Sequence, residues 1–348
     1  MTDAVPVPRS SINPPAMLGV VGGGPLARYV VLAAQSMGYR TTVLDPDPSA
    51  PAGAVADAHL VAPFDDAAAL RQLADTSAVV TTALEVAPSA ALRSISERTA
   101  VRPSPDALDV CLDRIAERSF LSELGVPLAS WRAILTDIDV EAAVGADFPA
   151  ILKAARPGGA TAKASVVNHA ALAAAWESLG RVPCVLERRL RVFKELSIVV
   201  ARTPDGATAC FPVAQNLLIK GELDSTYAPA SLPAGGQEGA EDLAAYIADE
   251  LDLVGVLAIE MFVVARSVYV NRLLPHPHRT AHFTLDACVT SQFEQQVRAV
   301  CGLGLGATDL SAPGAATFTL HGDVWPDSMP DWSLVLDRKR TRLNSSHV

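Results

Sequence analysis

Apolar runs near the N-terminus alternate with glycine and with a helical pattern. Met17–Val21 is apolar, three consecutive glycines follow it, and a helical spacing extends to Met37 before a second apolar run, Arg40–Leu44. This order predicts a strand, a glycine turn, a helix and a second strand. We therefore expect a Rossmann-like α/β domain in this part of the chain.

Two long apolar segments follow each other in the C-terminal half. Gly255–Val264 and Ser267–Leu274 predict two strands with a polar loop behind them. Glu260 interrupts the first strand. An acid inside an apolar strand is costly to bury unless it is paired or binds a metal, so Glu260 is a candidate functional residue.

The loop after these strands is rich in cationic side chains, with His276, His278, Arg279 and His282 close together. A buried acid beside such a loop is typical of a site for a metal and an anionic substrate. The alternative is a core acid that one arginine, for instance Arg272, neutralises, with the histidines on a solvated loop. This segment alone leaves both interpretations open.

Composition and charge exclude some classes of function. The chain has 348 residues, which is enough for two or three packed units, and a net charge of −10. Apart from the tail 338–348, Lys and Arg form no cluster of the size that a nucleic-acid footprint would need, so we expect no nucleic-acid partner. An apolar run long enough to span a membrane is missing, and the first 16 residues lack the apolar core of a signal peptide. We expect no membrane partner.

The five cysteines are scattered without the close spacing of zinc sites: Cys111, Cys184, Cys210, Cys288 and Cys301. This pattern argues against a disulfide framework and favours a reduced, cytoplasmic protein. We expect the cysteines to act as small buried hydrophobes.

The first glycine turn allows a second interpretation. Gly22, Gly24 and Ala27, with Asp45 about 20 residues later, match the spacing of a dinucleotide-binding fingerprint. Glycines there let the backbone approach a phosphate at a helix N-terminus. An NAD-dependent dehydrogenase is therefore a further hypothesis, although the later segments carry no motif that supports it.

Several motifs in order resemble one enzyme family. They are Ile259-Glu260-Met261-Phe262, Ser291-Gln292-Phe293-Glu294-Gln295, Lys194-Glu195-Leu196-Ser197, the apolar strand that ends at Glu187, and the run of residues 44–66. Together they resemble ATP-grasp ligases, and among these the 5-(carboxyamino)imidazole ribonucleotide synthases. The resemblance extends from about Leu18 to Trp325.

The resemblance implies both a fold and a reaction. The fold is α/β, with a Rossmann-like pre-ATP-grasp domain (17–105) after a disordered lead (1–16), an ATP-grasp domain of α+β subdomains (106–303) and a partial C-terminal lobe (304–337). The tail 338–348 is basic and polar, unlike the rest, and is interpreted as non-native. In the reaction, ATP and bicarbonate give carboxyphosphate, and aminoimidazole ribonucleotide then takes the carboxyl group. Mg²⁺ is the implied cofactor, and a homodimer is typical of the family.

The resemblance also implies roles for individual residues. ATP would be bound by Arg114, Lys153, Gly158, Glu187, Arg188, Leu190, Glu195 and Asn271, and the ribonucleotide by Gly24, Arg28, Glu85 and His278. Lys153 and His282 would be catalytic, and Glu260 would bind the metal. For the acids Glu85 and Glu195 and for the arginines of the segment 106–124, solvated positions are the alternative.

The chain departs from the family pattern at functional positions. The second metal-binding glutamate of the family is Arg272 here, and the acid of the glycine loop is Ala160. A guanidinium about 4 Å from Glu260 would compete with Mg²⁺. Where the family usually has a lysine, this chain has Arg118, which keeps the positive charge but donates hydrogen bonds with a different geometry. A second hypothesis is therefore a nucleotide-binding or regulatory module that has lost catalysis.

Overall fold

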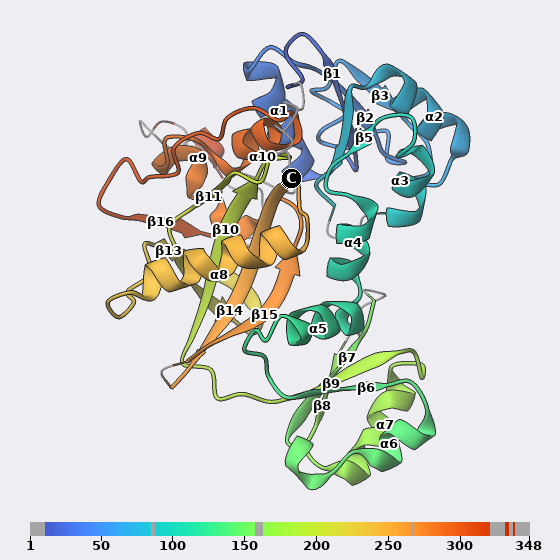
Figure 1. Cartoon of the computed structure of the whole chain (residues 1–348), viewed down its shortest axis with the longest axis vertical. Coiled ribbons are helices and arrows are strands. Elements are labelled where there is room, and N and C mark those ends of the chain that lie inside the picture. Colours follow the sequence, from blue (N-terminus) through green and yellow to red (C-terminus); the bar gives the residue numbers. More distant parts are fainter. Residues whose placement is uncertain are drawn as a thin grey trace, which may run out of the picture.

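A computed structural model of the chain describes residues 11–84, 88–156, 163–265, 267–320, 331–333 and 337. Three sheets follow one another along the longest axis of the molecule (Figure 1). The N-terminal domain lies at one end, a large sheet lies in the middle, and a small sheet lies at the other end. None of the helices in these ranges is long and apolar enough to cross a membrane.

The N-terminal domain is a parallel five-stranded sheet with the order β3-β2-β1-β4-β5. The chain runs from β1 through β2 to β3 and then returns to the other side of β1, where β4 and β5 follow. This reversal is the arrangement of a doubly wound α/β fold and confirms the Rossmann-like prediction. Its strands are β1 (Met17–Val21), β2 (Arg40–Leu44), β3 (Ala58–Leu60), β4 (Val79–Thr82) and β5 (Ala100–Val101), and its helices are α1 (Pro25–Ser36), α2 (Ala67–Thr76) and α3 (Ser89–Ile95).

Two short helices lead from this domain toward the small sheet. These are α4 (Pro105–Leu112) and α5 (Arg114–Glu123). Asp113 separates them because its side chain accepts hydrogen bonds from the backbone N–H groups of Ile115 and Ala116. An aspartate that caps a helix in this way fixes the residue at which the helix begins, and so it places Arg114 in the first turn of α5.

The small sheet has the order β6-β9-β7-β8 and antiparallel pairing. Its strands are β6 (Trp131–Ile134), β7 (Ala150–Ala154), β8 (Lys163–Val166) and β9 (Cys184–Arg188). The helices α6 (Asp137–Ala142) and α7 (His169–Ser178) lie against it, with the 3₁₀ turn η1 (Gly145–Asp147) before β7. The buried side chains of Leu152, Leu186 and Trp176 form its core.

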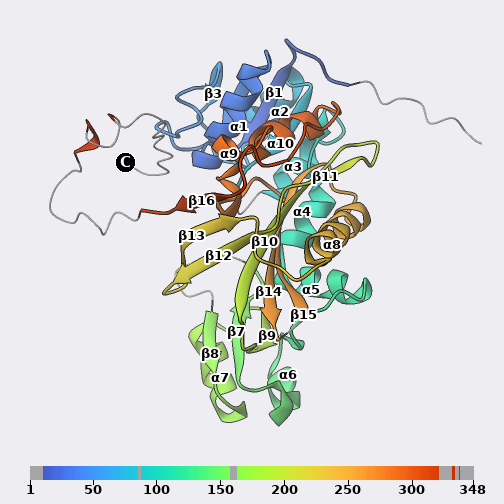
Figure 2. The same cartoon turned by 90° about the vertical axis from the view of Figure 1, so that its left-hand side faces the viewer.

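The large sheet has the order β15-β14-β10-β12-β13-β16, with β11 paired to β10. Its strands are β10 (Lys194–Arg202), β11 (Thr208–Cys210), β12 (Ala214–Ile219), β13 (Glu222–Ala228), β14 (Gly255–Val264), β15 (Ser267–Leu274) and β16 (Ala315–Phe318). Helix α8 (Gly236–Glu250) lies along one face (Figure 2), where Ile247 packs with Ile198 and Ile259. The opposite face of β14 and β10 carries the polar side chains discussed below.

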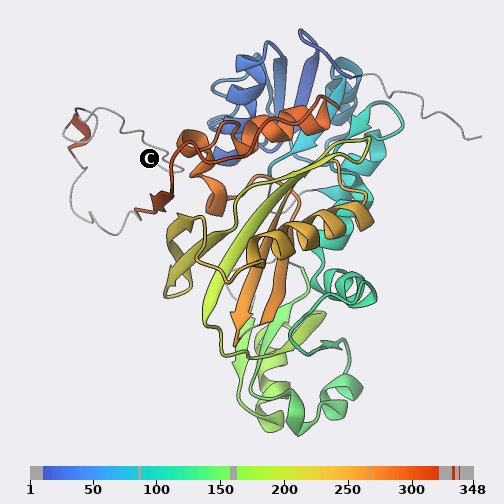
Figure 3. The same cartoon turned by 60° about the vertical axis from the view of Figure 1, so that its left-hand side comes forward.

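The last helix joins the large sheet to the N-terminal domain. After the 3₁₀ turn η2 (Arg279–Ala281) and α9 (Thr284–Ala287), helix α10 (Gln292–Val300) packs on α1 and β14 (Figure 3). The buried Gln296 accepts a hydrogen bond from Val256 N (2.7 Å) and donates one to Thr81 Oγ1 (2.9 Å). Arg102 also donates to Val300 O (2.6 Å). These contacts hold the two domains together.

The two predicted strands Gly255–Val264 and Ser267–Leu274 are confirmed with the same ends. The amphipathic pattern of residues 239–251 predicts a helix. The observed helix α8 begins earlier, at Gly236, because Pro233 and the left-handed Gly235 turn the chain into it. Within the predicted partial C-terminal lobe (304–337), Ala315–Phe318 form β16, which pairs with β13 at the edge of the large sheet. Cys111, Cys184 and Cys301 are buried as expected, whereas the other two cysteines are half-buried.

Candidate active site

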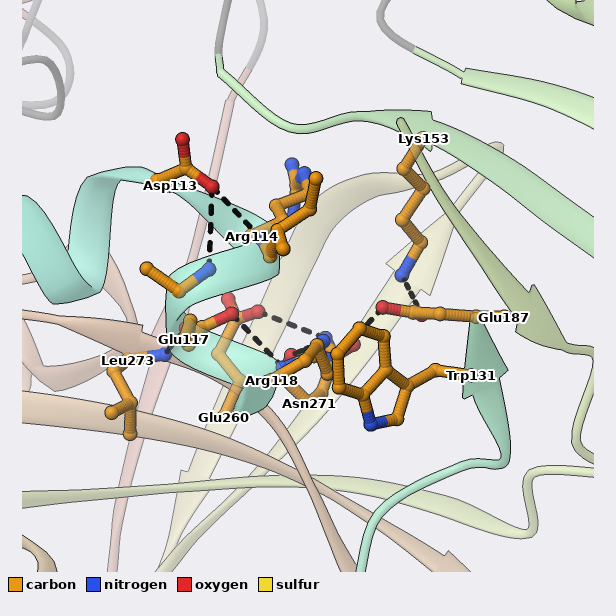
Figure 4. Close-up of polar contacts among 12 residues, drawn as sticks. Asp113, Arg114, Glu117, Arg118, Trp131, Lys153, Glu187, Glu260, Asn271 and Leu273 are labelled. Carbon is orange, nitrogen blue, oxygen red and sulfur yellow. Dashed lines mark hydrogen bonds and ion pairs between the residues drawn. The ribbon is translucent and has the colours of Figure 1, made fainter. Parts of the chain in front are cut away.

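A set of charged side chains lies where α5, the small sheet and the large sheet meet (Figure 4). Arg114 begins α5 and docks on the end of β7, since its backbone N–H donates to Ala155 O (2.8 Å) and its Nε to Ala154 O (3.2 Å). Lys153 precedes these residues on β7. The capping of α5 and the register of β7 therefore bring two predicted phosphate-binding cations side by side.

Lys153 is paired in this structure. Its Nζ donates to Glu187 Oε2 at 2.5 Å, while Arg118 Nε donates to Glu187 Oε1 at 2.9 Å. Burial alone would raise the pKa of Glu187, but Lys153 and Arg118 together hold that pKa below its ordinary value. The carboxylate is therefore ionised at neutral pH and keeps both cations in place.

The cations themselves are held in a dehydrated environment. Burial lowers the pKa of Lys153, and the nearby Glu187 opposes this effect. Burial also lowers the pKa of Arg114, and the neighbouring Arg272 adds to the shift. A negative ligand is attracted more strongly to such buried positive groups than to exposed ones, because water screens the buried charges less. The cluster is thus suited to bind a polyphosphate.

The large sheet contributes an acid to the same region. Glu260 on β14 lies opposite Arg272 on β15, and the next pair is Met261 with Val270. Asn271 is therefore the extra residue of a β-bulge, and its Nδ2 donates to Glu260 Oε2 at 3.2 Å. A bulge places an additional side chain on one face of a sheet. Here it brings Asn271, rather than Arg272, to the carboxylate.

This pairing argues against the alternative in which Arg272 neutralises Glu260. Within the described residues, no ion pair of 4 Å or less joins the two side chains, although their strands are in register. Arg272 acts at longer range on Glu117 and Arg114. The guanidinium thus contributes positive charge to the site without occupying the carboxylate.

Magnesium is the metal that the family resemblance implies. The described ranges contain no group of three or more His, Cys, Asp or Glu side chains that could hold a metal. Mg²⁺ in nucleotide enzymes often takes one or two carboxylates and completes its shell with phosphate oxygens and water. The carboxylate of Glu260 and the amide oxygen of Asn271 fit an ion that arrives with a nucleotide, and they do not fit one held by protein ligands alone.

Other predicted nucleotide residues lie at the hinge between the sheets. Arg188 ends β9 and is exposed, Leu190 follows it and is half-buried, and Glu195 lies near the start of β10. Burial raises the pKa of Glu195, and the neighbouring Glu260 raises it further. In the pairing of β10 with β14, Glu195 lies opposite Phe262 and Ser197 lies opposite Glu260, so the two acids are diagonal neighbours on the polar face of the large sheet.

The glycine turn before α1 is held by hydrogen bonds to the side chain of Asp45. Asp45 accepts from Gly23 N at 2.6 Å with one carboxylate oxygen and from Asp47 N at 2.8 Å with the other. This carboxylate stabilises the turn. In a dinucleotide-binding fingerprint the corresponding acid would instead accept hydrogen bonds from the ribose hydroxyls. A side chain added at Gly24 would meet nothing within 4 Å, so the outer side of the turn is open.

The predicted histidines lie close to this domain. His282 stacks on Phe293 and meets the edge of Tyr29, with ring centroids 5.8 and 5.9 Å away. Burial lowers the pKa of His282 to about 4 and that of His278 well below its ordinary value. Both imidazoles are therefore neutral at pH 7. Arg28, one position before Tyr29 on α1, is exposed.

Comparisons with known proteins agree with this architecture. The ATP-grasp domain family matches residues 119–293, and the ribonucleotide synthetase preATP-grasp domain family matches residues 16–112. The N5-carboxyaminoimidazole ribonucleotide synthase of Bacillus subtilis is 37% identical over 317 residues, which cover 90% of this chain and 83% of the relative. The chain belongs to the N5-carboxyaminoimidazole ribonucleotide synthase family.

Solved structures of this family have the same fold. The N5-carboxyaminoimidazole ribonucleotide synthetase from Thermus thermophilus superposes with a TM-score of 0.85 at 34% identity, and the match covers 93% of this chain and 87% of the other. The Aspergillus clavatus enzyme, in complex with ADP and 5-aminoimidazole ribonucleotide, gives 0.82 at 25% identity, over 92% and 85%. The predictions of family, fold class and ATP-grasp ligase class are confirmed.

Three positions of interest lie outside the described residues. They are Glu85, a predicted substrate-binding residue, Gly158 of the predicted phosphate loop, and Ala160 at the position of the missing loop acid. Their roles stay predictions.

Sequence reasoning missed the importance of Glu117 and Arg118. The alternative interpretation placed the arginines of this helix on a solvated face, but the side chain of Arg118 is only 2% exposed. A signal was present: Glu117 and Leu121 are four residues apart, and Arg118 and Leu121 are three apart, so all three share the buried face of α5. The partners of this face, however, come from β9 and β15.

Proposed function

We propose that this chain carboxylates 5-aminoimidazole ribonucleotide with bicarbonate and ATP, in purine biosynthesis. ATP and bicarbonate would give carboxyphosphate and ADP. The amine of the ribonucleotide would then displace phosphate from carboxyphosphate and form a carbamate. The observation that carries this proposal is the cluster of Lys153, Arg114 and Glu187 between the two sheets, beside Glu260, in a chain that belongs to the family.

The cations would do most of the work of phosphoryl transfer. Catalysis of this step consists largely of positioning the reactants and neutralising charge on the transferred group. Lys153 would leave Glu187 and bind the phosphates, while Arg114 holds them from the first turn of α5. Arg118 stays on Glu187, so the acid remains paired after Lys153 moves. This exchange explains why two cations share one carboxylate.

Glu260 and Asn271 would hold the Mg²⁺ that accompanies ATP. Bound there, the ion supplies positive charge to the phosphate oxygens. Arg272, on the same face of the sheet, would add to this charge from the protein side. Glu195, Arg188 and Leu190 would contact the nucleoside near the hinge, where Arg188 N donates to Ser130 O at 2.8 Å and so fixes the end of β9.

The ribonucleotide would bind between the open glycine turn and the histidine loop. Gly24 and Arg28 come from the start of α1, and His278 and His282 come from the segment after β15. His282 Nδ1 is buried and has no hydrogen-bond partner among the described residues. A neutral imidazole with a vacant nitrogen can accept a proton or a hydrogen bond from the substrate amine.

The test is phosphate release from ATP by the full chain, with Mg²⁺ and bicarbonate, with and without 5-aminoimidazole ribonucleotide. We expect release that increases at least several-fold when the ribonucleotide is added, together with formation of the carboxylated product. Lys153→Met serves as the inactive control, and the exposed Lys220→Met as the active one. ATP binding without stimulated release would contradict the proposal.

A specific observation favours a second candidate, a nucleotide-binding module without turnover. Arg272 occupies a position in register with Glu260, where a second acid would have completed a metal site. Under this alternative, ADP binds equally well with and without Mg²⁺, and the ribonucleotide stimulates nothing. Homodimer formation and a cytoplasmic location stay predictions.

A further inference from the structure

The buried guanidinium of Arg118 connects three separate elements. Its Nε donates to Glu187 Oε1 on β9 (2.9 Å), one terminal nitrogen donates to Glu117 Oε2 on α5 (2.9 Å), and the other donates to the carbonyl oxygen of Asn271 on β15. Glu187 belongs to the small sheet and Asn271 to the large sheet. A single side chain thus ties together the two halves of the nucleotide site (Figure 4).

Glu117 completes the connection. Its Oε1 accepts from Leu273 N, while its Oε2 accepts from Arg118. The backbone atoms that Arg118 and Glu117 hold, Asn271 O and Leu273 N, lie on either side of Arg272. Arg118 and Glu117 therefore bind the backbone on both sides of the bulge that places Asn271 beside Glu260.

The burial of these side chains rules out a surface ion pair. The side chains of Arg118 and Glu117 are 2% and 1% exposed, and that of Glu187 is 7% exposed. Buried charges are costly unless well paired, and apolar residues of similar volume are often as stable. The buried ion pairs of Arg118 are therefore better explained by the residues that they position than by the stability that they contribute.

We propose that Arg118 and Glu117 are positioning residues. They hold Glu187 relative to the bulge that carries Asn271, and Glu187 in turn places Lys153 until a nucleotide takes this lysine. Neither residue needs to touch the nucleotide. Arginine suits this role because its planar group donates in several fixed directions at once, whereas lysine is a point charge. The inference rests on the proposed function, because it takes Lys153 to be the phosphate-binding group.

The experiment compares the affinities of ADP and adenosine by calorimetry, with Mg²⁺ present. Adenosine lacks the phosphates, so it reports on the nucleoside contacts alone. We expect Arg118→Met to weaken ADP binding at least tenfold and adenosine binding less than threefold. In a Lys153→Met background, Arg118→Met should weaken ADP binding less than twofold further, because the residue through which it acts is missing.

Two additional variants guard against misfolding. Glu117→Gln/Arg118→Met removes both charges, so no unpaired acid stays buried on α5, and it should show the same selective loss of ADP affinity. Arg118→Lys should restore part of that affinity, since it keeps the charge near Glu187. Arg181→Met is the matched control, because Arg181 forms an ion pair with Asp137 on the outside of the small domain.

The possible outcomes separate the two proposals. If the unchanged protein binds no ADP, the proposed function fails. If it binds ADP and Arg118→Met weakens ADP and adenosine equally, or weakens ADP by the same factor with and without Lys153, Arg118 has only a structural role and the inference is wrong. An unchanged affinity in Glu117→Gln/Arg118→Met would also overturn it.

Discussion

The two ends of the candidate active site are built on different physical principles. At the nucleotide end, Lys153, Glu187 and Arg118 form a chain of buried ion pairs with short contacts. At the ribonucleotide end, His278 is buried and His282 is half-buried, and both rings are neutral. The ring of His282 packs against Phe293 and Tyr29. The nucleotide end holds paired charges before the ligand arrives, whereas the two histidine rings at the ribonucleotide end carry no charge at pH 7.

The difference follows from what each end is expected to bind. A polyphosphate brings several negative charges, and preorganised cations stabilise them without reorganisation during the reaction. The amine of the ribonucleotide must instead lose a proton as the carbamate forms, and a neutral imidazole can assist that loss. Substitutions at the two ends should therefore differ in kind. They should disturb stability and phosphate binding at one end and pH dependence at the other.

The largest effect is expected at the ion pairs. Arg118→Met leaves Glu117 buried without its partner and deprives Glu187 of one of its two cations. Breaking a buried ion pair on one side typically costs about 3–5 kcal/mol of unfolding free energy. Urea denaturation should show this loss, and Glu117→Gln/Arg118→Met should recover part of it. Equal losses in the two variants would mean that the unpaired acid is not the cause.

The next effect concerns catalysis. Lys153→Met removes a donor that we expect to move from Glu187 to the phosphates. Loss of one preorganised donor to a developing charge costs about 10²–10³-fold in turnover. Steady-state phosphate release should fall by this factor. Lys220→Met should leave the rate unchanged, because Lys220 lies exposed at the turn between β12 and β13. A fall of less than threefold for Lys153→Met would remove this lysine from the reaction.

The sequence predicts which residues form the nucleotide end better than it predicts the contacts between them. The strands that carry Glu187 and Glu260 follow from apolar runs that end in, or contain, a charged residue. Their meeting in space does not, because it depends on three sheets packing around α5. The sequence leaves open whether a metal or Arg272 is the partner of Glu260, whereas in the structure Asn271 donates to this carboxylate. A β-bulge shifts the register by one residue without altering the apolar pattern, so alternation alone cannot reveal it.

At the ribonucleotide end, the pH dependence of stability provides the next test. The folded-state pKa of His282, about 4, lies below the ordinary value of 6.5. Between these two pKa values the unfolded chain binds a proton at His282 and the folded chain does not. The contribution of this residue to the free energy of unfolding is therefore fully present above pH 6.5 and is lost as the pH falls toward 4. The contribution of this residue is on the order of 3 kcal/mol. In His282→Gln, the loss between these pH values should be smaller by that amount.

Proton NMR of the imidazole gives an independent check on the same residue. The ring resonance of His282 should stay unchanged from pH 8 to about pH 5 and shift only at lower pH. A midpoint near the ordinary value would contradict the dehydrated surroundings of this ring. The imidazole would still be mostly neutral at pH 7, and it would accept a proton more readily than a ring with a pKa of about 4.

The smallest expected effect concerns Arg272. Arg272→Glu places a second acid in register with Glu260, and it should lower the Mg²⁺ concentration for half-maximal ADP binding by about tenfold, or about 1.4 kcal/mol. Arg272→Gln is the control, because it removes the positive charge without adding an acid, and it should have a smaller effect. Calorimetric titrations of ADP at a series of Mg²⁺ concentrations measure both.

The outcome for Arg272 decides how the nucleotide end balances its charge. If Arg272→Glu tightens Mg²⁺ binding and also speeds phosphate release, the arginine limits a reaction that depends on the metal. If it tightens Mg²⁺ binding but slows release, the guanidinium itself neutralises the phosphates, together with Lys153 and Arg114. An unchanged Mg²⁺ dependence would mean that Asn271, which already donates to Glu260, keeps that carboxylate away from the ion.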